Sequence, residues 1–175
     1  MKKNILITGV PGVGKTTFIK KICGLLMPYN PVGFYTEEIR EGGVRKGFAL
    51  EGLRGGRGVL AGVAVASPFR VGKYGVDVRG FEKFLEKLDL NDARNRILVI
   101  DEIGKMECFS DKYIRLLDKA LASDRLVIAT IALKGGGFIA EVKKRVDVDL
   151  YEITRENRDL LVPKMVDRIR ACLNS

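Results

Sequence analysis

The chain has 175 residues, the length of one domain or of one domain with an insertion. Hydrophobic residues make up 46% and charged residues 30%, which excludes disorder as a global description because such a chain can bury a core. Lys and Arg (31) outnumber Asp and Glu (22), and the net charge of +9 favours an anionic partner: a nucleotide, a nucleic acid or a lipid headgroup. The chain has no histidine and its three cysteines lie far apart, which excludes histidine-dependent acid–base chemistry and nearly excludes a zinc site.

No segment of the chain is typical of membrane insertion or export. No apolar run approaches the roughly 20 residues that a membrane-spanning helix needs. The apolar stretch after Asn4 ends before Gly9 and is too short for the core of a signal peptide. An odd, scattered set of cysteines is typical of reduced thiols in a cytosol. We therefore expect a cytoplasmic protein that is a monomer and has no membrane partner.

The first part of the chain predicts a strand, a turn and a helix, followed by a meander. Residues 4–8 are apolar and predict a buried strand, residues 9–14 predict a Gly-rich turn, and an apolar face predicts a helix over about 15–27. Three further segments separated by Gly-rich turns predict an antiparallel meander over about 32–66. We place the strands of this meander at 32–40, 44–53 and 59–66.

The rest of the chain alternates between helices and strands after a Gly-rich loop at residues 67–80. The predicted elements, in order, are a helix around 81–88, a strand at 97–100, a helix at 110–121, a strand at 126–132, a short helix ending near 145, a strand at 146–153 and a helix at about 157–173. Pro163 is expected to kink the last helix or to mark a later start. The alternation predicts a parallel sheet with helices on both faces, so we expect an α/β fold in which residues 1–175 form a single domain with the meander as an insertion.

Residues 9–16 read GVPGVGKT and match the phosphate-binding pattern G-x-x-x-x-G-K-[ST]. Glycines let the backbone turn its N–H groups toward phosphate oxygens, and the helix that follows points its positive end at the same anion. Lys15 can reach the β- and γ-phosphates of a nucleoside triphosphate, and the Thr16 hydroxyl can bind Mg²⁺. The predicted nucleotide-binding residues are Gly9, Val10, Pro11, Gly12, Val13, Gly14, Lys15, Thr16 and Thr17.

A second apolar strand ends in the acidic pair Asp101 and Glu102, as a magnesium-dependent phosphate site requires. Asp101 is predicted to hold Mg²⁺ directly or through water, and Glu102 to polarise an attacking water. Phosphoryl transfer usually needs a cation beyond Lys15, and each candidate could equally be a solvated surface charge. The candidates are Arg70, Lys73, Lys105, Arg155 and Arg158, of which we take Arg70 as the catalytic residue together with Lys15 and Glu102.

Five segments carry a resemblance to a known family: GVPGVGKTT at Gly9, GFYTEEIR at Gly33, RVGKYGVDV at Arg70, DEIGKME at Asp101 and LYEITRENRDLL at Leu150. Together they resemble the small, broad-specificity nucleoside-triphosphatases of thermophiles and their "cancer-related" relatives in animals. The resemblance implies a P-loop fold related to the RecA-type ATPases. It also implies slow, Mg²⁺-dependent hydrolysis of ATP, GTP, CTP, UTP and TTP to the diphosphate and phosphate. Residues that the resemblance places at the lining of the site are Arg70, Lys73, Tyr74, Asn157 and Arg158.

Two other functions stay open from the sequence. Pro11 and the pair Thr16-Thr17 also occur in small P-loop kinases, so a nucleotide, nucleoside or polynucleotide kinase is an alternative. A glutamate directly after the metal aspartate favours water as the attacking group, and no Arg-rich lid insertion is evident. The basic charge also leaves a nucleic acid open as a partner, although no recognised RNA-binding motif is present. No base-reading motif is evident either, which predicts weak discrimination among bases.

Overall fold

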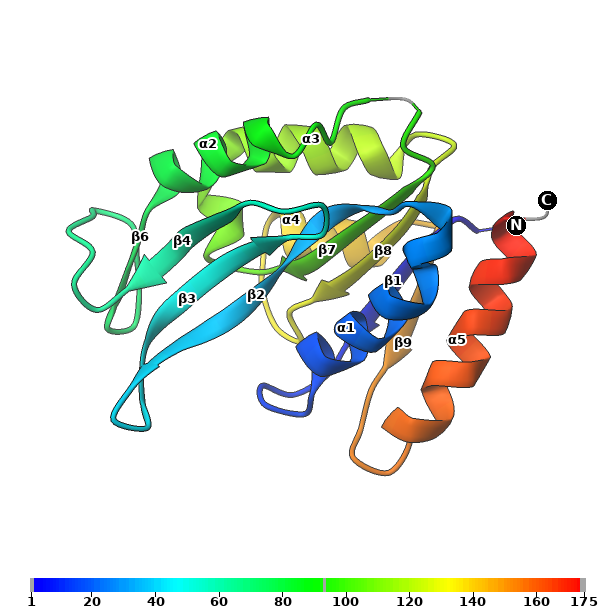
Figure 1. The fold of residues 1–175 in the computed structure, drawn as a ribbon, viewed down its shortest axis with the longest axis horizontal. Helices are drawn as coiled ribbons and strands as arrows, with labels where there is room; N and C mark the ends of the chain where they lie inside the picture. The colour runs from blue at the N-terminus through cyan, green and yellow to red at the C-terminus, as the bar shows by residue number, and fades with distance from the viewer. Residues whose placement is uncertain (1, 93, 174–175) are drawn as a thin grey trace.

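The computed structural model describes residues 2–92 and 94–173 and shows one sheet covered by helices (Figure 1). The strands are β1 (Asn4–Thr8), β2 (Val32–Glu41), β3 (Val44–Gly52), β4 (Arg57–Gly62), β5 (Arg70–Val71), β6 (Tyr74–Val76), β7 (Ile97–Ile103), β8 (Leu126–Ile131) and β9 (Val148–Glu152). The helices are α1 (Lys15–Leu26), α2 (Val78–Lys87), α3 (Asp111–Leu121), α4 (Phe138–Lys144) and α5 (Arg158–Leu173), with short 3₁₀ helices η1 (Met27–Tyr29) and η2 (Glu107–Phe109). Across the described residues the strands form a nine-stranded sheet in the order β5-β6-β4-β3-β2-β7-β8-β1-β9.

The sheet has a parallel part and an antiparallel part. The strands β2, β7, β8, β1 and β9 pair with one another in parallel. The strands β3, β4, β6 and β5 extend the sheet from β2 in antiparallel pairs. β8 lies between β1 and β7, so one strand separates the strand before the Gly-rich loop from the strand that carries Asp101 and Glu102. The arrangement confirms the predicted α/β fold, in which an antiparallel meander is added to a parallel sheet.

Both faces of the parallel part are buried, because successive residues of a strand point to opposite faces. Ile5 and Ile7 of β1 belong to a core with apolar residues of α1 and α5, whereas Leu6 between them belongs to a core with α2, α3 and α4. Figure 1 shows α1 and α5 against one face of the sheet, with α2 and α3 across the sheet from them. Burial on two faces explains why β1, β7 and β8 are continuous apolar runs.

The residues after the meander form more regular structure than the sequence predicts. The strand predicted at 59–66 is β4, which ends at Gly62, and the predicted loop 67–80 contains β5, β6 and the first residues of α2. α2 begins here because the Asp77 carboxylate accepts a hydrogen bond from the Gly80 N–H at 2.8 Å, which caps the helix. The prediction of a loop was therefore wrong for these elements. Strands of two and three residues are too short to show a hydrophobic period.

One strand extends farther than predicted, and the last helix has nearly its predicted bounds. β7 continues past Ile100 to Ile103, which is fully buried and pairs with Ile131 of β8. α5 begins at Arg158 and contains Pro163, so the proline does not mark a later start. The extension of β7 is stabilised by the burial of Ile103, which local sequence preferences do not indicate.

The carboxyl ends of the parallel strands meet at one edge of the sheet. The loop between β1 and α1, the acidic pair of β7 and the chain that follows β8 and β9 all lie at this edge. Ligands of open α/β sheets bind outside the carboxyl ends of the strands, so the fold directs attention to this edge. Within the two described ranges, no helix is both long enough and apolar enough to cross a bilayer.

Candidate active site

The phosphate loop, residues 9–16, connects β1 to α1 in a shape that its glycines allow. A Cβ atom on Gly9 would lie 2.7 Å from the carbonyl oxygen of Ile153, so only glycine lets the loop pass this close to the chain after β9. Gly14 has a φ of 108°, a left-handed conformation that side chains disfavour, and it is the N-cap of α1. The loop therefore leads directly to the N-terminal end of α1, where the helix N–H groups and dipole favour an anion.

Lys15 is folded back over the phosphate loop. Its ammonium Nζ donates a hydrogen bond to the Gly9 carbonyl oxygen at 3.1 Å and lies 3.8 Å from Oε2 of Glu102. The side chain is only 12% exposed. A polyphosphate bound in the loop would therefore meet a cation that is already held at the site.

Asp101 is buried and accepts hydrogen bonds from three threonines on three different elements. Thr16 Oγ1 of α1 donates to Oδ2 at 2.8 Å, and Thr130 Oγ1 of β8 donates to Oδ1 at 2.5 Å. Thr36 of β2 donates to Oδ2 from its hydroxyl at 3.2 Å and from its backbone N–H at 3.3 Å. Asp101 is only 1% exposed, and a carboxylate at such a site requires this number of donors to offset its lost hydration.

Thr36 and Thr130 are site residues that the sequence reasoning missed. Thr36 lies in the middle of β2, two residues beyond the segment that pairs with β7, and Thr130 lies near the carboxyl end of β8, on the other side of β7. The strand order therefore brings both hydroxyls to Asp101. The signal in the sequence is a threonine in each neighbouring strand, but this signal can be recognised only once the strand order is known.

Glu102 lies near Lys15 at the end of the site, and the charge of Lys143 also acts on it. Burial raises the pKa of Glu102 above its ordinary value; Lys15 opposes this rise, Asp101 adds to it and Lys143 opposes it. Lys143 comes from α4 and donates a hydrogen bond to the Leu133 carbonyl at 2.7 Å. Burial lowers the pKa of Lys143, and the charge of Glu102 opposes that change. A carboxylate with a raised pKa beside the phosphate loop is suited to accept a proton near neutral pH.

A second glutamate, Glu107, is buried beside Glu102. A Cβ atom on Gly104 would lie 2.8 Å from Oε1 of Glu102 and 2.8 Å from Oε2 of Glu107, so both carboxyl groups flank the same glycine. Glu107 is 4% exposed, and its burial, followed by the charge of Glu102, raises its pKa well above 4.5. The Tyr113 hydroxyl donates to the Glu102 carbonyl oxygen at 3.0 Å and supports the same turn. We interpret Glu107 as a protonated, uncharged carboxyl group that packs beside Glu102, the candidate general base.

Glu107→Gln is expected to stabilise the protein at neutral and alkaline pH. The folded state raises the pKa of Glu107 above 4.5, so the stabilisation from this group is complete below that pH and is lost as pH rises through the raised pKa. Glutamine carries no titrating proton and removes this loss. Urea unfolding at about pH 4 and about pH 8 measures the effect: the two proteins should differ little at the lower pH, and the variant should be more stable at the higher pH. The same pH dependence in both proteins would contradict the neutral form.

Oxygen donors that suit Mg²⁺ meet at Thr16 and Asp101. In nucleotide sites Mg²⁺ is usually held by one or two carboxylates, substrate phosphates and water. The Thr16 hydroxyl and the Asp101 carboxylate lie 2.8 Å apart and provide such donors. Among residues 2–92 and 94–173 no cluster of three or more Cys, Asp or Glu side chains is placed to hold a metal ion. Thr16 and Asp101 fit a Mg²⁺ ion whose other ligands are phosphate oxygens and water.

The hairpin of β5 and β6 lies at the far edge of the sheet from the phosphate loop. Arg70 is on β5, the outermost strand, and six strands separate it from β1. Its guanidinium donates to the Lys73 carbonyl oxygen at 2.9 Å, and Tyr74 accepts a hydrogen bond from Arg45 at 3.0 Å. The structure thus does not bring Arg70 to Lys15, and the catalytic role assigned to Arg70 from the sequence stays a prediction.

Arg158, in contrast, lies beside the phosphate loop. Its Nη1 atom is 3.8 Å from the position that a Cβ atom on Gly14 would occupy. It is the first residue of α5 and directly follows Asn157. The remaining cation candidates are exposed on the surface: Lys73, Lys105 and Arg155.

Comparison with known proteins assigns the chain to a family. A family model described as NTPase matches residues 4–166. The chain belongs to the NTPase family. A curated relative, the "Nucleoside-triphosphatase THEP1" of Thermotoga sp. (strain RQ2), is 42% identical to this chain over 167 residues, 95% of each chain. The human "Cancer-related nucleoside-triphosphatase" is 38% identical over 187 aligned positions, 98% of each chain.

Solved structures agree with membership of the NTPase family. The crystal structure of THEP1 from the hyperthermophile Aquifex aeolicus is 35% identical, covers 95% of this chain and 98% of that chain, and has a TM-score of 0.83. The solution structure of a human cancer-related nucleoside triphosphatase is 36% identical, covers 97% and 98%, and has a TM-score of 0.82. The family and the P-loop fold predicted from the sequence motifs are therefore confirmed, and the phosphate loop belongs to a hydrolase.

Proposed function

We propose that this protein hydrolyses nucleoside 5′-triphosphates to the diphosphate and phosphate, with Mg²⁺ and with little discrimination among ATP, GTP, CTP, UTP and TTP. The observation that carries the proposal is the meeting of the phosphate loop with the acidic pair of β7. Thr16 Oγ1 lies 2.8 Å from Asp101, and Lys15 Nζ lies 3.8 Å from Glu102. The names of the curated relatives support the same activity.

The phosphate loop and α1 bind the triphosphate in this proposal. Backbone N–H groups of the loop and the positive end of α1 surround the phosphate oxygens. The Lys15 ammonium neutralises charge on the β- and γ-phosphates, and Thr16 and Asp101 would hold the metal ion. Mg²⁺, when bound, supplies positive charge to the same oxygens and lowers the cost of bringing a nucleophile to them.

Glu102 activates the attacking water. A bond forms between the water oxygen and the γ-phosphorus, the bond from that phosphorus to the bridging oxygen breaks, and the diphosphate leaves. The proton of the water goes to the Glu102 carboxylate, whose raised pKa suits it to accept a proton at neutral pH. Asp101 cannot take this role while its oxygens accept four hydrogen bonds and face the metal position.

Slow turnover is part of the proposal because, among residues 2–92 and 94–173, the cations whose charge acts on Glu102 are two lysines, Lys15 and Lys143. An arginine at the transferred phosphate is worth about 10³–10⁵ in rate, and Arg70 lies at the far edge of the sheet.

Weak discrimination among bases is expected because the hydrogen-bonded polar groups of the site gather at its phosphate and metal end. A site without buried polar contacts to the base discriminates by about 10² or less.

Phosphate release without an acceptor tests the proposal. The purified protein is incubated with each Mg-NTP in turn, with no alcohol, nucleoside or RNA present, and inorganic phosphate is measured. Phosphate from all five nucleotides is expected, at rates within about 10²-fold of one another, and chelation of Mg²⁺ should stop release. Release only after an acceptor is added would contradict the proposal and favour a kinase. A preference above about 10⁴ for one base would contradict the broad specificity.

A further inference from the structure

The geometry of the first turn of α1 sets the direction in which a bound nucleotide leaves the phosphate loop. Thr16 faces Asp101, so the γ-phosphate end of the substrate lies toward Asp101 and Glu102. Thr17 is the next residue and is turned by about 100° around the helix axis. The sugar and base, attached at the opposite end of the triphosphate, therefore lie away from Asp101, and the side of α1 that Thr17 occupies is open to them.

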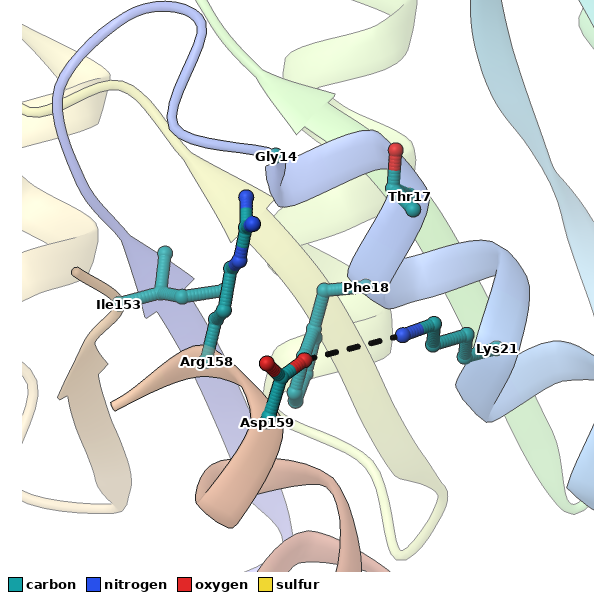
Figure 2. Close-up of a pocket in the computed structure, with 7 residues that line it drawn as sticks. All are labelled: Gly14, Thr17, Phe18, Lys21, Ile153, Arg158 and Asp159. Atoms are coloured by element: carbon teal, nitrogen blue, oxygen red, sulfur yellow. Dashed lines mark ion pairs between the residues drawn. The ribbon is translucent and has the colours of Figure 1, made fainter. Parts of the chain in front are cut away.

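A pocket of about 200 Å³ lies on that side, between α1 and the start of α5 (Figure 2). Its lining includes Gly14 of the phosphate loop, Thr17 and Lys21 of α1, Ile153 after β9, and Arg158 and Asp159 of α5. Pockets that enclose a complete small molecule are usually about 300–1,000 Å³. The size of this pocket suits one part of a nucleotide, such as its nucleoside, while the loop binds the rest.

Arg158 forms the wall of the pocket nearest the phosphate loop. Figure 2 shows its guanidinium pointing toward Gly14, and Nη1 lies 3.8 Å from the position of a Cβ atom on that glycine. Across the described part of the chain, this guanidinium has no hydrogen-bond or ion-pair partner. A planar guanidinium presents its face to aromatic rings and binds any base through stacking and cation–π attraction.

The chain before Arg158 is fixed by reciprocal hydrogen bonds. The Thr154 N–H donates to Asn157 Oδ1 at 2.8 Å, and the Asn157 N–H donates to Thr154 Oγ1 at 3.2 Å, in the manner of a capping box. The Asn157 side-chain amide also donates to the Glu152 carbonyl oxygen at 2.9 Å. These contacts fix the backbone just before Arg158 before any ligand binds. A side chain that starts from a fixed backbone loses less entropy when it binds a ligand.

The far end of the pocket carries a carboxylate. Asp159 pairs with Lys21 at 4.0 Å, and both side chains are largely exposed, at 79% and 57%. A carboxylate disfavours a phosphate group through like charge but accepts hydrogen bonds from sugar hydroxyls and from amino groups of bases. Because Lys21 balances the charge of Asp159, this end of the pocket has no excess positive charge to attract phosphates, and its carboxylate can still bind the hydroxyl and amino groups of a nucleoside.

We propose that this pocket binds the nucleoside of the substrate, with Arg158 against the face of the base and Asp159 accepting hydrogen bonds from the sugar or the base. Asn157 acts as a positioning residue for Arg158. This inference rests on the proposed binding of nucleoside triphosphates by the phosphate loop. Because Arg158, Asp159 and Lys21 are exposed, the pocket contacts every base without selecting one strongly.

Arg158→Ala separates the nucleoside contact from the phosphate contacts. Calorimetry measures the dissociation constants of Mg-ATP and of inorganic Mg-tripolyphosphate, which has no nucleoside. The variant is expected to bind ATP about 3- to 30-fold more weakly, the range of a cation–π contact, and to bind tripolyphosphate as the unaltered protein does. Retained tripolyphosphate binding also shows that the variant is folded. Asn157→Ala should give the same split with a smaller loss of ATP affinity.

Arg170→Ala is the matched control, because Arg170 is an exposed arginine on α5 about 18 Å along the helix from Arg158. It should bind both ligands normally. Two results with Arg158→Ala would overturn the inference: an equal loss of ATP and tripolyphosphate affinity, which would place Arg158 on the phosphates, or unchanged ATP affinity. Failure of the proposed hydrolysis is a separate result, since it would appear as no phosphate release by the unaltered protein and would not change the ratio of the two affinities.

Discussion

Lys15→Ala is expected to lower nucleotide hydrolysis by at least about 10²-fold. The substitution removes the ammonium that lies 3.1 Å from the Gly9 carbonyl oxygen, at the place where the phosphates bind. It also affects Glu102, whose pKa is raised by burial and lowered in turn by Lys15. Without Lys15 the pKa of Glu102 rises further, and less of the general base is ionised at neutral pH. Phosphate release with saturating Mg-ATP measures the loss.

Lys20→Ala provides the control on the same helix. Lys20 pairs with Glu37 and lies over the ring of Tyr35 at 4.6 Å, away from the phosphate loop. Its loss should leave turnover unchanged, and circular dichroism should show both variants folded. Turnover at the unaltered rate in Lys15→Ala would contradict the placement of the phosphates in this loop.

Glu102→Gln is expected to slow turnover by about 10²–10⁴-fold while Mg-ATP still binds. Glutamine keeps the shape of the side chain but cannot take the proton of the attacking water. In the unaltered protein, Glu102 becomes protonated as pH falls through its pKa, and turnover falls with it. Because burial raises the pKa of Glu102, this fall in turnover occurs at a higher pH than for an ordinary glutamate. The pH profile of turnover in the unaltered protein and the affinity of the variant for Mg-ATP measure the two effects.

Comparison with Glu107→Gln decides which of the two neighbouring glutamates is the base. Both carboxyl groups flank Gly104, but Glu107 is buried and its pKa lies well above 4.5. A protonated carboxyl group is a poor proton acceptor and cannot serve as a general base. Glutamine in place of Glu107 should therefore keep turnover within about tenfold. The opposite pattern, with Glu107→Gln inactive and Glu102→Gln active, would move the base to Glu107.

The phosphate loop and the acidic pair could be predicted because their chemistry is local. The eight residues from Gly9 to Thr16 form the loop by themselves, and Asp101 and Glu102 directly follow an apolar strand. Neither prediction depends on which strands are neighbours. The parallel sheet also followed from the alternation of strands and helices, which is visible along the chain.

The residues that surround Asp101 could not be predicted, because they depend on strand order. Thr36 and Thr130 lie 65 and 29 residues away from Asp101 in the sequence, and they meet it only because β2 and β8 lie on either side of β7. Arg70 shows the reverse: its motif suggests a site residue, but β5 is the outermost strand of the sheet. A sequence pattern identifies residue types, whereas tertiary pairing decides which of them meet.

Hydrolysis of ATP in water enriched in heavy oxygen (¹⁸O) tests the central claim most directly. The claim is that water, activated beside the phosphate loop, attacks the γ-phosphorus. The account predicts that label from the solvent appears in the inorganic phosphate and not in the diphosphate during the first turnover with Mg-ATP. Label in the diphosphate, or no phosphate formed at all, would contradict it.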